Sequence, residues 1–254
     1  MRPSGDLARQ SATSHELEFL ASGGVYEPKR RVRFHPRRLW VLRHARFLVI
    51  CSLTVILTYT FIGEAAMVPT GSMEGTILVG DHLIVNKLLY GPRVPFTHWR
   101  LPMLKTVRRG NIIAFHYPRD PQLNFLKRVA AVGGDKVEIR NDILFVNDVP
   151  VAEPYVVHTK KQWQREREDM AAQVIPAGHL FVLGDNRDNS DDSRYWGTVP
   201  VENVIGEPLI ILWSYDAPSR DWLDENPMRQ LRFYGSIVAN LFTRTRWSRT
   251  GTLL

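Results

Sequence analysis

Residues 67–87 read MVPTGSMEGTILVGDHLIVNK, a short polar turn between apolar runs. The run at 77–87 has the pattern of a strand, a turn and a second strand. Ser72 in the preceding turn is either a local turn former or a nucleophile. The Gly-x-Ser-x-Gly pattern of α/β-hydrolases is not met, because Thr70 and Glu74 stand where that pattern requires glycine. A catalytic Ser72 would therefore need an activating group from elsewhere in the chain.

The segment before this turn is apolar enough to suggest a membrane span. Residues 47–63 (FLVICSLTVILTYTFIG) contain no charged side chain, and their length approaches the roughly 20 residues that a bilayer core requires. Residues 1–46 hold ten Lys or Arg against four acidic residues, which predicts a cytoplasmic N-terminus. A cleavable signal peptide would have a shorter lead-in. We expect a basic cytoplasmic tail over 1–46, a single anchor over 47–63 and the functional domain outside.

The sequence from residue 64 onward is typical of β structure. Turn residues separate short apolar runs, and we predict strands over 111–117, 124–132, 136–140, 143–146, 149–151, 180–183 and 204–213. The two-residue turn Asn141-Asp142 predicts a hairpin. Charged residues over 158–173 predict a helical insertion. The expected fold is mostly β: one N-terminal transmembrane helix, then a curved antiparallel β-sheet catalytic domain over 64–216, with a small inserted helical and β subregion over about 135–178.

Two segments leave alternatives open. The basic C-terminal segment, 217–254, has five arginines and no acidic residue from 228 onward, and it either touches anionic lipid or closes the domain. Residues 89–108 (LYGPRVPFTHWRLPMLKTVR) form either an ordinary long loop or an apolar patch that rests on the membrane.

Charge and cysteine content exclude several classes of function. The pI is 9.7, but the basic residues flank apolar segments without a recognition motif, so no nucleic-acid partner is expected. The single cysteine, Cys51, allows no intrachain disulfide. The eight histidines are scattered and form no HExxH motif. We therefore expect no metal site and no cofactor.

A serine nucleophile requires a base, and a lysine can serve when burial lowers its pKa from about 10.4 toward about 7–8. Lys127 lies in the apolar run NFLKRVAAV, which favours a buried amine, although an exposed strand lysine is the alternative. A second polar cluster, GDNRDNSDDSRYWG at 184–197, follows a predicted buried strand. It lacks the glycine and distal glutamate of an EF-hand loop, but it could pair Asp with Arg and present a hydroxyl to a buried amine.

Four segments now appear in a recognisable order: PTGSMEGT, RGNIIAFHYP, FLKRVAAVGGDKV and GDNRDNSDDSRYWGTVP. Together, over about residues 64–214, they resemble the type I signal peptidases of bacteria. The resemblance implies a membrane-bound serine endopeptidase that removes N-terminal signal peptides from exported preproteins after small residues, at Ala-x-Ala sites. It implies a protein of the bacterial cytoplasmic (inner) membrane, with its catalytic domain on the periplasmic or extracytoplasmic side. Some members of the family have two anchors, whereas this sequence predicts a single-pass protein. Implied partners are exported preproteins, the lipid bilayer and the protein-export machinery.

The same resemblance assigns roles to individual residues. Ser72 is implied as the nucleophile and Lys127 as the general base, with the Thr70 hydroxyl and the Ser72 N–H as the oxyanion hole. Ser190 would hold the Lys127 amine, and the loop would be braced by Asp192, Arg194 and Asp185. The implied substrate pockets are lined by Val68, Pro69, Met73, Ile77 and Leu126.

Two positions depart from the family pattern. Gly75 stands where proline is common, and Phe125 stands where some relatives carry tyrosine, so that hydroxyl is not available to Lys127. Two other functions stay open. One is an anchored Ser/Lys protease that cleaves itself or a regulator, and the other is a non-catalytic domain that binds exported proteins.

Overall fold

The first described element is a long helix, α2. The computed structural model describes residues 36–58, 62–92, 94, 97, 99–159 and 169–254, and the chain divides into two units, 1–51 and 52–254. Helix α2 (Pro36–Leu57) exposes apolar side chains at Trp40, Phe47, Leu48, Val49, Ile50, Leu53, Val55 and Leu57. None of the described helices has the length and apolar character needed to cross a membrane. Residues 59–61 of the expected anchor lie outside the described residues.

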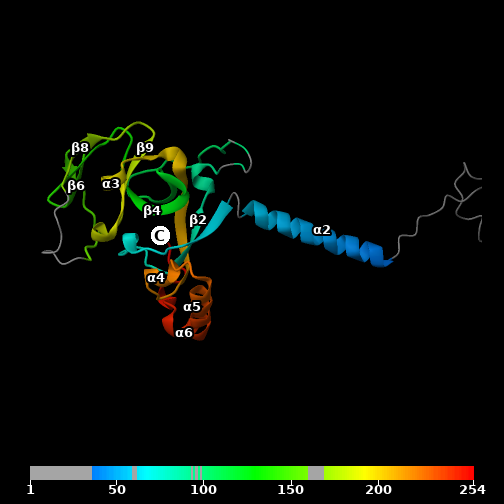
Figure 1. Ribbon diagram of the computed structural model, residues 1–254. Coiled ribbons are helices and arrows are strands. Elements are labelled where there is room, and N and C mark those ends of the chain that lie inside the picture. The colour runs from blue at the N-terminus through cyan, green and yellow to red at the C-terminus, as the bar shows by residue number, and fades with distance from the viewer. Residues whose placement is uncertain (1–35, 59–61, 93, 95–96, 98, 160–168) are drawn as a thin grey trace, which may run out of the picture. The chain divides into compact units, whose positions relative to one another are not determined.

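The second unit is built on a seven-stranded antiparallel sheet (Figure 1). Its strand order is β1-β2-β11-β3-β4-β9-β10. In chain order the strands are β1 (Gly63–Met67), β2 (Asp81–Asn86), β3 (Ile112–Tyr117), β4 (Asp120–Val132), β9 (His179–Leu183), β10 (Val199–Pro200) and β11 (Val204–Ser214). The register shifts within β11 against both of its neighbours. Irregularities of this kind increase local twist and bend a sheet. The predicted antiparallel, mostly β domain is confirmed.

A smaller four-stranded sheet is inserted between β4 and β9. Its order is β7-β6-β5-β8, formed by β5 (Lys136–Arg140), β6 (Ile143–Val146), β7 (Val149–Pro150) and β8 (Met170–Val174). The predicted hairpin is present: Asn141 and Asp142 have φ of 51° and 65°, as the favoured two-residue hairpin turn requires. The predicted helix over 158–173 is wrong at its C-terminal end, because Met170 begins a strand that pairs with β5. Residues 160–168 lie outside the described residues.

The strand predicted at the start of 77–87 is also wrong. Ile77 donates its N–H to the Met73 carbonyl, and the Leu78 N–H donates to the Asp81 carboxylate at 2.9 Å. Gly80 has φ of +85°, which favours glycine, and a side chain there would collide with the Tyr215 carbonyl. These local bonds make residues 77–80 a tight turn, and the strand begins only at Asp81.

Strand β9 is buried on both faces and joins the two main cores. Leu180 and Val182 belong to one apolar cluster with Phe115 of β3. Phe181 and Leu183 belong to the second cluster, which covers the inserted sheet. This separation follows from the two-residue period of side chains along a strand. The loop that begins at Gly184 is therefore attached to one of the most firmly packed strands.

The C-terminal residues form helices and then return to the sheet. Helices α4 (Ser219–Trp222), α5 (Pro227–Ala239) and α6 (Leu241–Arg244) gather beside one another after β11 (Figure 1). Beyond them, the Ile211 N–H donates to the Thr252 carbonyl, and the Gly251 N–H donates to the Ile211 carbonyl. Arg249 forms an ion pair with Asp81 at 2.6 Å. The last ten residues thus close one side of the sheet.

The loop at 89–108 combines anchored and exposed residues. The Arg100 guanidinium donates to the backbone carbonyls of Gly91 and Val204 at 2.8 and 2.7 Å. Trp99 and Leu104 are 78% and 72% exposed. Pro95 and Phe96 of the predicted apolar patch lie outside the described residues.

Candidate active site

Ser72 lies at the centre of a single 3-10 turn, Gly71–Met73, after β1. The turn closes through the Glu74 N–H, which donates to the Gly71 carbonyl at 3.2 Å. Ser72 is 8% exposed, whereas Thr70, directly before the turn, is exposed. Gly75 follows with φ of +108°, a backbone conformation that proline, fixed near −65°, cannot adopt. The departure from proline at this position is therefore required by the local backbone.

Lys127 reaches Ser72 from β4. Its Nζ donates a hydrogen bond to Ser72 Oγ at 2.6 Å, and its side chain is 4% exposed. Burial lowers the pKa of Lys127 from 10.5 to about 8, because the charged amine loses its hydration; Asp192 and Asp191 partly offset this shift. The Phe125 ring lies 5.5 Å from the amine. The structure therefore brings together a hydroxyl and an amine whose pKa is close to neutral.

The loop after β9 packs directly against the Ser72 turn. A Cβ added at Gly184 would lie 2.5 Å from both the Ser190 Cβ and the Ser72 carbonyl oxygen, so only glycine permits this approach. The Asn186 N–H donates to the Ser72 carbonyl at 3.0 Å, and its side chain donates to the Gly71 carbonyl at 3.2 Å. Asn186 is fully buried. The backbone of Ser72 is thus fixed by a loop more than 100 residues away in the sequence.

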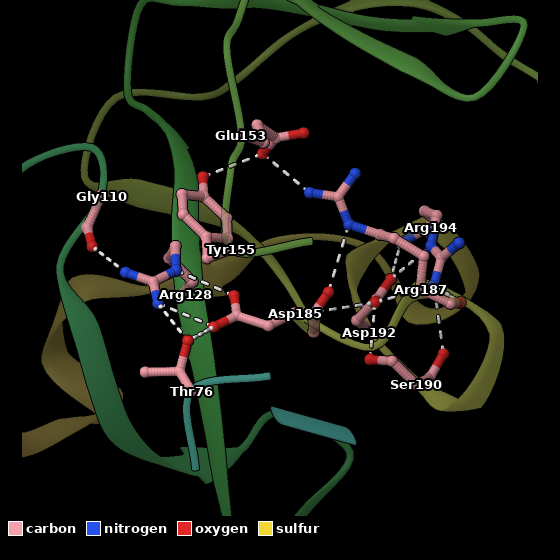
Figure 2. Close-up of polar contacts among 11 residues, drawn as sticks. Thr76, Gly110, Arg128, Glu153, Tyr155, Asp185, Arg187, Ser190, Asp192 and Arg194 are labelled. Atoms are coloured by element: carbon pink, nitrogen blue, oxygen red, sulfur yellow. Dashed lines mark hydrogen bonds and ion pairs between the residues drawn. The ribbon is translucent and has the colours of Figure 1, made fainter. Parts of the chain in front are cut away.

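Three of the four predicted supporting residues, Ser190, Asp192 and Arg194, form one hydrogen-bonded group (Figure 2). Asp192 accepts from the Ser190 hydroxyl at 2.7 Å, from the Gly184 N–H at 3.0 Å and from Arg194 Nε at 2.8 Å. The Ser190 hydroxyl therefore donates to Asp192, and its oxygen can still accept a hydrogen bond. Among the described residues Lys127 donates to Ser72 and makes no hydrogen bond to Ser190, so the predicted contact between the two is not formed here. The side chains of Ser190, Asp192 and Arg194 are all buried or nearly so.

Asp185 lies on the other side of the loop, in a cluster that Figure 2 shows around Arg128. The Asp185 carboxylate accepts two hydrogen bonds from Arg128, at 2.8 and 2.7 Å, and one from the Thr76 hydroxyl at 2.6 Å. Arg128 also donates to the Gly110 carbonyl and stacks on the Tyr155 ring, 4.0 Å from its centroid. A two-pronged Arg–carboxylate pair has a fixed geometry. It holds β4 and the loop in one register beside Lys127.

A third group ties the segment after β7 to the same loop (Figure 2). Glu153 accepts from Arg187 at 2.7 Å and from the Tyr155 hydroxyl at 3.0 Å. The Glu153 and Arg187 side chains are 9% and 7% exposed. Burial and the neighbouring Glu153 raise the pKa of Tyr155, which keeps its hydroxyl a donor. The inserted sheet therefore contributes to the support of the loop.

The five predicted pocket residues are only partly assembled. Val68, Met73 and Ile77 belong to one apolar cluster, and Leu126 packs against it. Met73 and Ile77 are 1% and 0% exposed, so a ligand could reach them only after side-chain movement. Pro69 is half-buried and is not a member of that cluster.

Sequence reasoning missed several supporting residues, namely Thr76, Arg128, Glu153, Tyr155, Asn186 and Arg187. A signal was available for Arg128, because neighbouring strand residues point to opposite faces. A buried Lys127 therefore directs Arg128 to the other side of β4, where it needs an acidic partner. No local pattern could have identified Glu153, whose partner Arg187 is 34 residues away.

Comparison with known proteins identifies the family. The family model for signal peptidase, peptidase S26, matches residues 41–213. Signal peptidase I of Pseudomonas fluorescens is 34% identical over 197 residues, covering 65% of this chain and 69% of the relative. Signal peptidase I of Aquifex aeolicus is 30% identical over 241 residues, covering 73% and 89%. The crystal structure of a signal peptidase I from Enterococcus faecalis is 35% identical and covers 41% of this chain and 97% of its own, with a TM-score of 0.35.

The family match spans more than half of the chain and contains both Ser72 and Lys127. The relatives from Pseudomonas fluorescens and Aquifex aeolicus are both named signal peptidase I, and the matches cover 69% and 89% of their lengths. The chain therefore belongs to the signal peptidase family, peptidase S26, and is a serine endopeptidase.

Proposed function

We propose that this chain cleaves N-terminal signal peptides from exported preproteins by a Ser72–Lys127 dyad. The observation that carries the proposal is the 2.6 Å hydrogen bond between the buried Lys127 amine and Ser72 Oγ. That distance lies within reach for proton transfer. A pKa of about 8 leaves an appreciable fraction of neutral amine near neutral pH, and only the neutral amine can act as a base.

The reaction is acyl transfer in two steps. Neutral Lys127 takes the Ser72 proton as Oγ attacks the carbonyl carbon of the scissile peptide bond, and a tetrahedral oxyanion forms. The bond to the leaving nitrogen then breaks, and charged Lys127 gives that nitrogen its proton. In the second step Lys127 takes a proton from water, which attacks the ester carbonyl. The signal peptide leaves with a free carboxylate, and Ser72 regains its proton.

The Ser72 N–H and the Thr70 hydroxyl are proposed as donors to the oxyanion. Thr70 is exposed next to the almost buried Ser72, which supports access from the substrate side. A donor of this kind contributes about 2.7–4 kcal/mol to transition-state stabilisation. Ser190 is proposed to hold the Lys127 amine as an acceptor, and Asp192, Arg194 and Asp185 are proposed to keep the loop in place.

Cleavage after Ala-x-Ala is proposed from the apolar residues beside Ser72. Val68, Met73 and Ile77 belong to one buried cluster, and Leu126 packs against it. A site formed by residues packed this closely would admit small side chains and reject large ones by steric exclusion. Pro69 is proposed as part of its rim.

Membrane anchoring over 47–63 is proposed from the uncharged sequence of that segment, the basic residues before it and the apolar side chains exposed on α2. In this proposal residues 1–46 are cytoplasmic, and the catalytic unit over 64–216, with its insertion at about 135–178, lies outside the cytoplasmic membrane of a bacterium. The C-terminal segment over 217–254 completes that unit. The export machinery would deliver the preproteins.

The test is cleavage of a purified preprotein by the full chain in lipid vesicles. Wild type is compared with Ser72→Ala and Lys127→Ala, and the new N-terminus is identified by mass spectrometry. We expect a single cut after Ala-x-Ala that both substitutions abolish. Cleavage of the chain itself or of a regulator alone would favour the self-processing alternative. Binding of preprotein without any cut by folded wild type would favour the non-catalytic alternative.

A further inference from the structure

Asn186 donates hydrogen bonds to both of the peptide groups that flank Ser72. Its backbone N–H donates to the Ser72 carbonyl at 3.0 Å, and its side-chain Nδ2 donates to the Gly71 carbonyl at 3.2 Å. The Gly71 carbonyl also accepts from the Glu74 N–H at 3.2 Å. Asn186 is 0% exposed, so these bonds lie in a low-dielectric environment where they are stronger than in water. One buried residue therefore fixes the backbone on both sides of Ser72.

The Gly71 carbonyl and the Ser72 N–H belong to the same peptide group. Because a peptide group is planar, a hydrogen bond that fixes the direction of its carbonyl also fixes the direction of its N–H. Among the described residues the Ser72 N–H has no hydrogen-bond acceptor. Hydrogen bonds in a chain polarise one another, so donors to the carbonyl strengthen the N–H as a donor. Asn186 thus acts on the backbone group that is proposed to stabilise the oxyanion.

The orientation of the Asn186 amide is set by its neighbours. The Glu74 carboxylate accepts from Nδ2 at 3.1 Å, and the Thr159 hydroxyl donates to Oδ1 at 3.2 Å. A carbonyl and a carboxylate only accept hydrogen bonds, so the amide nitrogen must face Gly71 and Glu74. The reversed amide would direct its oxygen at these two acceptors. The side chain is therefore held in the orientation that donates to Gly71.

Glu74 reaches the amide across Gly71. A Cβ at residue 71 would lie 2.7 Å from the Glu74 carboxyl carbon, so a side chain there would displace the carboxylate from Asn186. Glu74 is half-buried, and within the described part of the chain its side chain has no second hydrogen bond and no ion pair. The contacts therefore assign one role to the Glu74 side chain, which is to hold the Asn186 amide.

We propose that Asn186 is a positioning residue whose amide orients the Ser72 N–H toward the oxyanion. Glu74 and Thr159 hold the amide in place for this role. The proposal rests on the proposed acyl transfer at Ser72, because the oxyanion forms only in that reaction. Asn186 is uncharged, and among the described residues it makes no hydrogen bond to Lys127. Loss of its amide should therefore weaken stabilisation of the tetrahedral intermediate and leave the base unchanged.

The experiment measures kcat and KM separately, for cleavage of a preprotein by the full chain in lipid vesicles. It also measures the Kd of a peptide aldehyde with an Ala-x-Ala sequence. Ser72 Oγ bonds to the aldehyde carbon, and the hydroxyl proton passes to the former carbonyl oxygen, which takes the position of the oxyanion. The variants are Asn186→Ala, Glu74→Ala and Glu74→Gln. The matched control is Asn189→Ala, because Asn189 is exposed in the same loop and its side chain has no hydrogen bond among the described residues.

We expect Asn186→Ala to lower kcat by at least about tenfold and by no more than the roughly 100- to 1,000-fold that removal of an oxyanion donor costs. KM should be unchanged, and the aldehyde Kd should rise by a factor similar to the loss in kcat. The pH profile of kcat/KM should not move, because Lys127 is untouched. Glu74→Ala should lower kcat by a smaller factor. Glu74→Gln should restore it, since the glutamine oxygen still accepts from Asn186. Asn189→Ala should match wild type.

Several outcomes would overturn the proposal. Wild-type kcat in folded Asn186→Ala would do so and would leave the dyad intact. A loss of kcat with a shifted pH profile, or with a matching rise in KM, would mean that the amide acts through Lys127 or through substrate binding. If circular dichroism shows that Asn186→Ala is unfolded, the half-buried Glu74 provides the test, and equal kcat in its two variants would overturn the proposal. A wild type as inactive as Ser72→Ala would overturn the proposed function and this inference together.

Discussion

Replacing the buried amine with an apolar side chain should stabilise the protein. Lys127 is 4% exposed, and burial lowers its pKa from 10.5 to about 8. A shift of this size corresponds to about 3 kcal/mol of unfavourable free energy for the charged amine in the folded state. Lys127→Met removes that cost and fills a similar volume, but it also removes the hydrogen bond to Ser72, which contributes about 1 kcal/mol. We therefore expect the variant to gain about 2 kcal/mol in free energy of unfolding at pH 7.

The gain should depend on pH in a defined direction. Between pH 8 and 10.5 the unfolded chain holds the lysine proton while the folded chain has lost it. The unfolded state binds more protons in this window, so wild-type stability rises with pH. Lys127→Met has no such rise. Its advantage is therefore complete below about pH 8 and shrinks as pH approaches 10.5.

The assay is urea unfolding of the full chain in detergent micelles, followed by tryptophan fluorescence from pH 7 to pH 10. Lys136→Met is the matched control, because Lys136 is an exposed strand lysine that pairs with Asp148 on the surface. That substitution should change stability by less than about 1 kcal/mol. A Lys127→Met protein that is less stable than wild type at pH 7, or whose difference from wild type does not change with pH, would refute the reasoning.

Three further predictions concern the same site. The kcat/KM of the wild type should rise with pH and level off above an apparent pKa of about 8, because Lys127 must be neutral; a profile that falls over this range would contradict its role as base. Asp185→Asn leaves Arg128 without its charged partner and should lower the free energy of unfolding by about 3–5 kcal/mol, measured by urea unfolding, whereas an unchanged midpoint would show the pair to be dispensable. Gly184→Ala should displace the Ser72 carbonyl and lower kcat more than it raises KM, since a Cβ there lies 2.5 Å from that oxygen; wild-type kcat would rule out the close approach.

Local sequence patterns were sufficient to predict much of the sheet. Alternation and turn residues identified the β5–β6 hairpin, because the positive φ of Asn141 and Asp142 is a property of the turn itself. The same reasoning failed where the secondary structure of a segment depends on long-range contacts. Residues 170–174 pair with β5 as a strand although their neighbours are charged, and Asp81 takes part in a turn that is closed by Arg249.

The residues of the site likewise fall into those that local sequence could predict and those that it could not. Ser72 and Lys127 could be proposed from their local contexts, and the structure brings them within 2.6 Å of each other. The groups that hold them could not be found so directly. Arg128 and Asp185 are 57 positions apart, and Asn186 reaches Gly71 across 115 positions. Such pairings depend on strand order, which single-residue patterns do not specify.

The C-terminal segment shows that sequence alone does not predict the direction of individual side chains. Its charge was visible in the sequence, but the two suggested roles, lipid contact and closure of the domain, could not be assigned to individual arginines. Arg249 forms an ion pair with Asp81 of β2, and Arg246 forms one with Asp216 just after β11, while Arg232 of α5 is exposed. The sequence could not separate them, because the direction of each side chain depends on how the segment packs.

The most direct measurement is chemical trapping of the nucleophile. Folded full-length protein is treated with a serine-acylating inhibitor across a range of pH, and the modified peptide is identified by mass spectrometry. The account predicts one adduct on Ser72, formed faster as pH rises toward and above 8, and formed neither by Ser72→Ala nor at an appreciable rate by Lys127→Ala. An adduct on another serine, or acylation of Ser72 at an undiminished rate without Lys127, would contradict the proposed dyad.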